Sequence, residues 1–181
     1  MLLVLCVPAL GGLYDAALYR AYRPKRYPCA AVFMAAACLI LICTLHDDLL
    51  VVKGVLFSHL LILAAYCDAL TGEIPNEIPL LLIAVGAIRC IPGDAFPGAL
   101  AVSVPLLILA CVFRDSVGGG DIKLMAACGW VLGVSGVIAG AVSGILFLAV
   151  THVVRHKKSY AMAPYFAAGC FLAYFVRSDL H

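Results

Sequence analysis

Long apolar runs separated by short polar connections make up almost the whole chain. Charged residues gather mainly at the ends of these runs. A membrane-spanning helix needs roughly 20 apolar residues, so the pattern predicts an all-α, polytopic transmembrane helical bundle of about eight spans, in a single domain covering residues 1–181. The expected spans are Leu2–Tyr19, Pro28–Leu45, Leu49–Asp68, Ile78–Ile91, Pro97–Phe113, a short Asp121–Leu132, Gly136–Val154 and Met162–Val176.

Composition excludes a soluble globular domain. Of the 181 residues, 65% are hydrophobic and 12% are charged, with a mean hydropathy of +1.11. Soluble domains carry about 25% charged residues. Nine cysteines lie almost entirely within the apolar runs and none is spaced as Cys-x-x-Cys. They are therefore interpreted as small core residues, without a zinc or redox role.

The basic residues are distributed unevenly between the two sides that eight spans define. Nine fall on one side and three on the other. The positive-inside rule then makes the first side cytosolic and places the N-terminus outside, as expected for a multi-pass protein of the cell (inner) membrane. The cytosolic set is Arg20, Arg23, Lys25, Arg26, Arg114, Lys123, Arg155, Lys157 and Lys158, and the other set is Lys53, Arg89 and Arg177.

The stretch Asp115–Lys123, which reads DSVGGGDIK, separates two apolar runs. Three glycines allow the backbone to bend sharply and to be approached closely. Asp121 follows them where a helix is expected to begin, so a turn with a capping aspartate is the simplest interpretation. A second aspartate at the same membrane edge favours a catalytic interpretation instead.

Asp68 is that second aspartate. It ends the third run, about 28 Å along a helix from Leu49, and so lies near the cytosolic boundary with Asp121. An acidic residue there is a functional candidate, although headgroup water alone could solvate it. Two adjacent carboxyls share a proton readily, and such a pair can activate water and polarise a scissile carbonyl. The dipole of the preceding helix disfavours charge on Asp68, which predicts Asp121 as the ionised base.

Other carboxylates compete less well for this role. Asp47 and Asp48 fall on the outer side, Glu73 and Glu77 flank a polar turn, Asp115 precedes the glycines, and Asp15 is expected to pair structurally within the membrane.

Other hydrolytic chemistries have weaker support. The chain has no His-Glu-x-x-His zinc motif, and neither a metal nor a cofactor is expected. Gly133-Val134-Ser135-Gly136 resembles the serine motif of rhomboid proteases. His152 lies about 25 Å farther along the same run, although His46 could share the outer side with Ser135.

Two motifs resemble those of the prepilin peptidases, membrane aspartic proteases whose wider class includes presenilin and signal peptide peptidase. Asp68 is followed by Thr71-Gly72-Glu73-Ile74-Pro75-Asn76, which is similar to Asp-x5-Ile-Pro-Asn. Gly118-Gly119-Gly120-Asp121-Ile122-Lys123 is similar to Gly-x-Gly-Asp-x-Lys, and Ala163–Ala167 resembles the motif of the last span.

This resemblance implies an aspartic endopeptidase with Asp68 and Asp121 as catalytic residues. Its substrates would be type IV prepilin-like precursors, cleaved after a glycine to remove a short basic leader at the cytosolic face. Glu73, Glu77 and Asp115 are the expected contacts for the lysines of that leader. Membrane lipids are the other expected partner, and nucleic acid is not expected. Longer members carry a cytosolic Cys-x-x-Cys insert and methylate the new N-terminus, whereas only Arg20–Tyr27 occupies that place here.

A transporter is the alternative from a different class. Short spans interrupted by glycine are typical of ion-coupled transporters. Such proteins place their carboxylates near the middle of the membrane, whereas Asp68 and Asp121 are expected at one edge.

Overall fold

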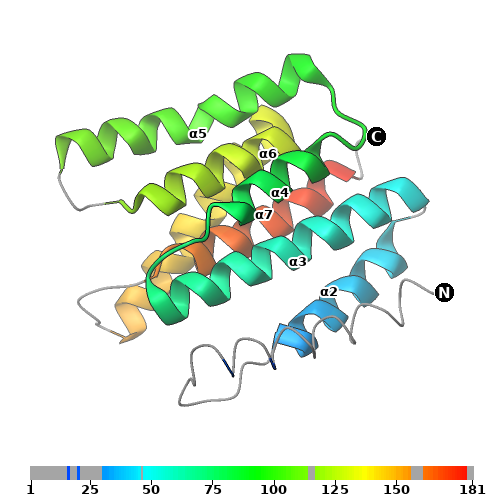
Figure 1. The fold of residues 1–181 in the computed structure, drawn as a ribbon, viewed down its shortest axis with the longest axis horizontal. Coiled ribbons are helices and arrows are strands. Elements are labelled where there is room, and N and C mark those ends of the chain that lie inside the picture. Colours follow the sequence, from blue (N-terminus) through cyan, green and yellow to red (C-terminus); the bar gives the residue numbers. More distant parts are fainter. Residues whose placement is uncertain are drawn as a thin grey trace.

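The structure is a computed structural model that describes residues 16, 20, 30–45, 47–113, 117–155 and 161–178. Within these residues the chain is helical and contains no strand, which confirms the all-α expectation (Figure 1). The helices are α2 (Ala30–Thr44), α3 (Asp48–Thr71), α4 (Glu77–Gly86), α5 (Pro92–Val112), α6 (Gly119–Arg155) and α7 (Ala163–Ser178).

Three of these helices, α3, α5 and α6, are long and apolar enough to cross a membrane, whereas α2, α4 and α7 are shorter apolar helices. These lengths support a membrane protein but do not confirm about eight spans. The first predicted span, Leu2–Tyr19, lies outside the described residues apart from Ala16. The described part therefore supports the polytopic class and leaves the span number a prediction.

Helix α6 is broken into two arms at Gly133. This glycine has φ 67° and ψ −174°, a backbone conformation that residues with a Cβ rarely adopt. Both arms contact the same point of α7, because Cys128 hydrogen-bonds to Cys170 and a Cβ on Gly140 would lie 3.0 Å from the Cys170 Sγ. Twelve residues of straight helix would span about 18 Å, so arms 119–132 and 134–155 must fold back on each other (Figure 1).

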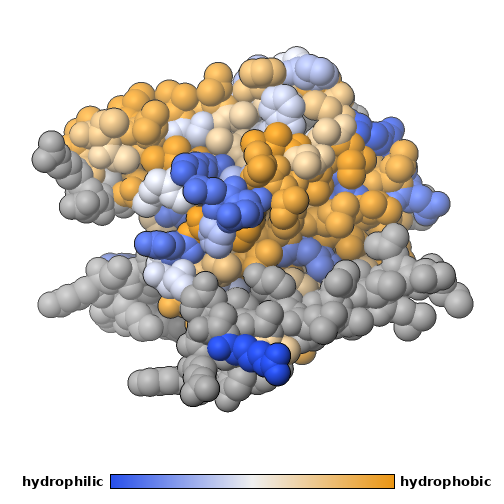
Figure 2. Space-filling model, viewed as in Figure 1, coloured by the Kyte–Doolittle hydropathy of each residue, from blue (hydrophilic) through white to orange (hydrophobic). Residues whose placement is uncertain are grey.

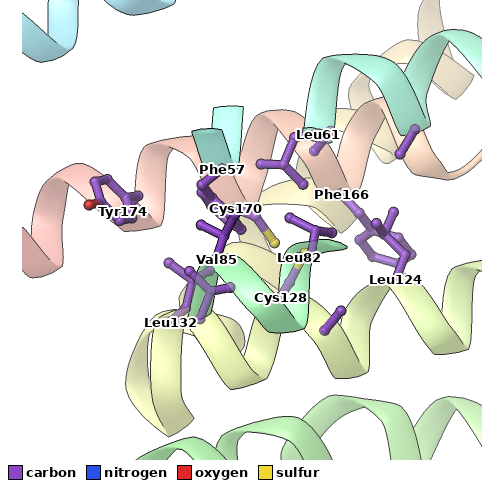
Figure 3. Packing of buried hydrophobic residues seen from close by; sticks show 14 of the residues in the cluster. Phe57, Leu61, Leu82, Val85, Leu124, Cys128, Leu132, Phe166, Cys170 and Tyr174 are labelled. Atoms are coloured by element: carbon purple, nitrogen blue, oxygen red, sulfur yellow. The ribbon is translucent and has the colours of Figure 1, made fainter. Parts of the chain in front are cut away.

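The hydrophobic core lies where α3, α4, α6 and α7 meet. Phe57 and Leu61 of α3 are fully buried there, together with Leu82 of α4 and Leu124 of α6 (Figure 3). Cys170 of α7 is also fully buried. The interpretation of the cysteines as core residues holds for four of the seven that the structure describes, because Cys43 and Cys111 are exposed and Cys90 is partly exposed. This core fixes the four helices that carry the candidate site.

Helix α5 packs on one side of α6 and exposes the rest of its surface. Gly98 and Gly129 allow the close approach, since a Cβ on Gly129 would lie 2.1 Å from the Gly98 carbonyl oxygen. Figure 2 shows predominantly hydrophobic colouring over the α5 side of this face. Large exposed apolar residues of α5, which suit contact with lipid, are Phe96, Leu100, Val104, Leu107, Ile108 and Val112.

The boundary between α4 and α5 differs from the prediction. The sequence suggested Ile78–Ile91 followed by a loop at Pro92–Asp94, but α4 ends at Gly86 and Pro92 begins α5. Proline suits the first turn of a helix, because the backbone N–H groups there have no partner within the helix. Asp94 is consequently a residue of the first turn of α5.

Candidate active site

Asp68 lies in the last turn of α3, where the helix ends and the polar connection to α4 begins. It is 8% exposed. Gly72 closes the helix in a left-handed conformation and donates its N–H to the Asp68 carbonyl oxygen at 2.9 Å. The Asp68 carboxyl group is therefore held at the end of a well-capped helix.

The partner of the Asp68 side chain comes from α7. The Ala163 N–H donates to Asp68 Oδ2 at 2.9 Å, and Ala163 is completely buried. Ala163 is the first residue of α7, where backbone N–H groups face outward and the helix dipole is positive. Asp68 thus has a donor suited to a carboxylate, contributed from 95 residues away.

Asp121 lies in the first turn of α6, just after the glycines, and is 7% exposed. Its Oδ2 approaches Gly118 so closely that a Cβ there would be 3.2 Å away. The Gly118 backbone hydrogen-bonds to the Asp121 carboxyl group. Asp121 Oδ1 is buried without a hydrogen-bond partner in the described part of the chain.

The two carboxyl groups interact with each other. Asp68 acts electrostatically on Asp121 across the space between α3 and α6. The structure therefore brings together the two aspartates that the sequence selected, although their catalytic role remains a prediction. Both carboxyl groups have a backbone hydrogen bond, but Asp121 Oδ1 is buried without a partner in the described part of the chain, which favours the proton on Asp121, unlike the sequence-based prediction.

The two sequence motifs also contact each other beyond the aspartates. A Cβ on Gly120 would lie 3.2 Å from the Ile74 Cβ, so Ile74 packs directly against the glycine backbone. Lys123 Nζ donates to Asn76 Oδ1 at 2.8 Å. These contacts tie the α3–α4 connection to the start of α6. The motif spacing identified all four residues, but only the fold pairs them.

The competing carboxylates are placed elsewhere or fall outside the described residues. Asp47 and Asp48 lie at the opposite end of α3, while Glu73 and Glu77 are exposed near the carboxyl pair. Other predictions that fall outside the described residues concern Asp15, Asp115, His46, Arg23, Lys25, Arg26, Arg114, Lys157 and Lys158.

Alternative centres receive no support from the described residues. No group of three or more histidines, cysteines, aspartates or glutamates in that part of the chain could hold a metal ion. Ser135 and His152 both lie on the second arm of α6, about 25 Å apart along the helix axis. That separation does not allow the serine–histidine contact that a nucleophile requires.

Comparison with known proteins places the chain in a family. The Type IV leader peptidase family matches residues 55–176, and the chain belongs to this family. A Bacillus subtilis relative, "Prepilin leader peptidase/N-methyltransferase", is 36% identical over 135 residues, which cover 67% of this chain and 54% of the relative. The chain thus aligns with about half the length of that relative. No solved structure matches the chain.

Proposed function

We propose that this chain is an aspartic endopeptidase of the membrane that removes the leader peptide from type IV prepilin-like precursors. The observation that carries the proposal is the pair of buried, interacting carboxyl groups of Asp68 and Asp121. Membership of the Type IV leader peptidase family and the name of the Bacillus subtilis relative support the substrate class. We place the reaction at the cytosolic face of the cell (inner) membrane, as the distribution of basic residues indicates.

The hydrogen bonds suggest how the two aspartates divide the work. Asp68 accepts the Ala163 N–H, so it carries the negative charge and takes a proton from the attacking water. Asp121 holds the proton and gives it to the carbonyl oxygen of the scissile bond as water adds, which forms a neutral tetrahedral diol. When the tetrahedral intermediate breaks down, Asp68 gives its proton to the leaving amine, and Asp121 regains one from the hydroxyl group. This order reverses the sequence-based prediction.

Glu73 and Glu77 are the proposed contacts for the basic leader. Glu73 lies on the α3–α4 connection, Glu77 begins α4, and both are exposed. They flank Asn76, which contacts Lys123 at the start of α6. Opposite charges on an exposed surface guide association and orientation more than they add affinity. The leader would therefore lie outside the membrane, over this connection.

We propose that the stretch between the first two expected spans supplies no N-methylation activity. The name of the relative includes a methyltransferase, and the longer family members place their cytosolic insert after the first span. Only eight residues, Arg20–Tyr27, stand there in this chain. That length cannot form a domain able to bind a methyl donor. A transporter is not favoured, because the family is one of peptidases and the carboxyl pair lies at the ends of helices.

The test is cleavage of a prepilin-like precursor by the purified full chain in lipid vesicles. Wild type should release the leader, whereas Asp68→Asn and Asp121→Asn should not. Asp94→Asn is the matched control, because it makes the same chemical change at the opposite end of the bundle. Substantial turnover by Asp68→Asn would refute the assigned carboxyl pair, and failure of wild type to cleave any precursor would refute the activity.

A further inference from the structure

A cavity, which we call the outer pocket, lies at the end of the bundle opposite the carboxyl pair. It encloses about 420 Å³, a volume typical of small-molecule sites. Lys53, on its wall, precedes Asp68 by fifteen residues of α3, which is about 22 Å along the helix. The outer pocket is therefore separate from the candidate active site. The polar side chains that line it include Lys53, Arg89, Asp94, Trp130 and Tyr174.

Two cationic side chains line the outer pocket from different elements. Lys53 belongs to the second turn of α3 and is only 7% exposed. A buried ammonium group is costly, and in membrane proteins such groups mark functional positions. Arg89 belongs to the α4–α5 connection, where its φ of 50° is uncommon for a residue with a Cβ. Arg89 Nη1 pairs with Asp47, and the planar guanidinium group has further N–H donors that can serve an anion.

Trp130 contributes a third donor. Its indole Nε1 is buried and has no hydrogen-bond partner among the described residues. An indole N–H can only donate, and a buried polar group without a partner calls for an explanation such as a bound acceptor. A Cβ on Gly86, another lining residue, would lie 3.0 Å from this Nε1. The polar edge of the indole ring is thus packed against the wall of the outer pocket, where an acceptor can satisfy it.

The carboxylate in the lining does not cancel this preference for an anion. Among the described residues that line the outer pocket, only Asp94 carries a carboxyl group. Its Oδ1 accepts the Val134 N–H at 3.1 Å. Val134 begins the second arm of α6, where the helix dipole is positive and offsets the charge of Asp94. Asp94 therefore has a structural role, and the two cations with the indole N–H remain for a ligand.

The outer pocket combines a polar rim with an apolar wall. Arg89 is exposed to water at the rim, whereas Leu50, Val131 and Leu132 supply apolar surface. Arginine and lysine are the side chains that bind phosphate groups in proteins. A phosphate ester suits both parts, because its phosphate group meets the cations while its organic part meets the apolar wall.

We propose that the outer pocket binds a phosphate ester, with the phosphate group between Lys53 and Arg89 and the Trp130 N–H as a third donor. The headgroup of a membrane lipid and a soluble phosphate ester share this chemistry. The site is independent of the carboxyl pair, so its occupancy does not depend on the cleavage of any precursor.

The first test measures binding to the purified, delipidated full chain in dodecyl maltoside, a detergent without phosphate. The probes are dihexanoyl phosphatidylglycerol, glycerol phosphate and dihexanoyl glycerol, which lacks the phosphate group. Calorimetry should show saturable binding of a phosphate probe and none of dihexanoyl glycerol. Tighter binding of phosphatidylglycerol would identify a lipid as the source, and equal affinity for glycerol phosphate would identify a soluble ester. Absence of binding by both phosphate probes, or equal binding of dihexanoyl glycerol, would overturn the proposal.

The second test removes one cation at a time with Lys53→Met and Arg89→Gln. Both substitutions remove the charge and keep an unbranched side chain, and each should raise the Kd of the tighter phosphate probe at least tenfold. Lys123→Met is the matched control, because Lys123 is an exposed lysine at the opposite end of the bundle. Its Kd should equal that of wild type. Equal Kd values in all variants, or the same increase in the control, would overturn the proposal.

Trp130→Phe keeps the proposal testable if the loss of a buried charge disturbs the fold. This substitution preserves a ring that can pack against Phe96 and removes the indole N–H. The Kd should rise roughly fivefold, as expected for the loss of one hydrogen bond, while the Tm without ligand stays close to that of wild type. An unchanged Kd in this variant would overturn the placement of the phosphate group in the outer pocket.

Discussion

The two ends of the bundle treat their carboxyl groups in opposite ways. At the end away from the carboxyl pair, Asp94 Oδ1 accepts the Val134 N–H at 3.1 Å. Asp47 accepts the Leu49 N–H at 3.0 Å and forms an ion pair with Arg89. Asp47 and Arg89 are 43% and 49% exposed, so water also solvates them. These carboxylates are well satisfied and hold neighbouring segments together.

The Asp68–Asp121 end is less well satisfied although it is more deeply buried. Asp121 Oδ1 has no hydrogen-bond partner among the described residues, and the two carboxyl groups act on each other. An arrangement of this kind costs stability, and such costs are typical of functional sites. Structural and reactive carboxylates thus differ in their hydrogen-bond partners. Residue type alone does not distinguish them.

The largest expected effect is on catalysis at the carboxyl pair. Asp68→Asn and Asp121→Asn should each lower kcat by roughly 10³-fold or more, because each removes a group that transfers a proton. Asp121→Asn should leave the Tm close to that of wild type, since the neutral amide replaces a carboxyl group that is proposed to be neutral already. Activity assays and thermal unfolding in detergent check both statements. A marked decrease in the Tm of Asp121→Asn would show that this end is structural as well.

Asp94→Ala should lower stability and leave catalysis intact. It removes the acceptor for the Val134 N–H and should lower the free energy of unfolding by about 1 kcal/mol, as loss of a helix cap does. Cleavage by the folded fraction should remain close to that of wild type. Loss of activity without loss of stability would place Asp94 in the catalytic machinery and contradict the comparison.

Gly133→Ala should lower the free energy of unfolding, because it strains the backbone at the end of the bundle that carries Asp47 and Asp94. A residue with a Cβ at φ 67° and ψ −174° costs about 1–3 kcal/mol. Gly93→Ala is the matched control, because a Cβ there meets nothing within 4 Å and its φ is not positive. Denaturant unfolding of both variants gives the difference, and equal stabilities would show that the turn tolerates a side chain.

The contact between Lys123 and Asn76 should have a moderate effect on kcat. Hydrogen bonds to charged groups contribute about 1.5–3 kcal/mol when shielded, and this one is exposed, so roughly a fivefold decrease is expected for either alanine variant. The double variant should be no worse than the single ones, because both remove one contact that positions the start of α6. Additive losses in a double-mutant cycle would mean that the two residues act separately.

The smallest effect concerns Asp47 and acid stability. The Leu49 N–H and, to a lesser extent, Arg89 lower the pKa of Asp47 below its usual value. Its contribution to stability is therefore present above the unfolded pKa of about 3.9 and is lost as the pH falls through the lower, folded value. Asp47→Asn should slightly flatten the decrease in Tm below about pH 4. An unchanged acid profile would show that neither the Leu49 N–H nor Arg89 stabilises the charged form of Asp47.

Sequence reasoning identified the helices and both aspartates, because hydropathy marks apolar runs and the motifs mark the ends of two of them. It did not identify Ala163 as a donor, since nothing in the sequence reveals a backbone N–H from 95 residues away. The same limitation underlies the difference between the sequence-based proton arrangement and the one proposed from the structure. Sequence reasoning also placed Lys53 at a membrane surface, whereas Lys53 is 7% exposed within the bundle. The packing of distant helices determines these contacts and this burial. Local spacing in the sequence does not encode that packing.

The hydrogen bond between Ala163 and Asp68 has a consequence for biosynthesis. A ribosome completes α3 long before it reaches α7, so the carboxyl pair exists in the nascent chain while its backbone donor does not. Until α7 has inserted and docked, Asp68 lacks the partner that favours its charge. The newly made chain would thus remain latent until α7 has docked against α3.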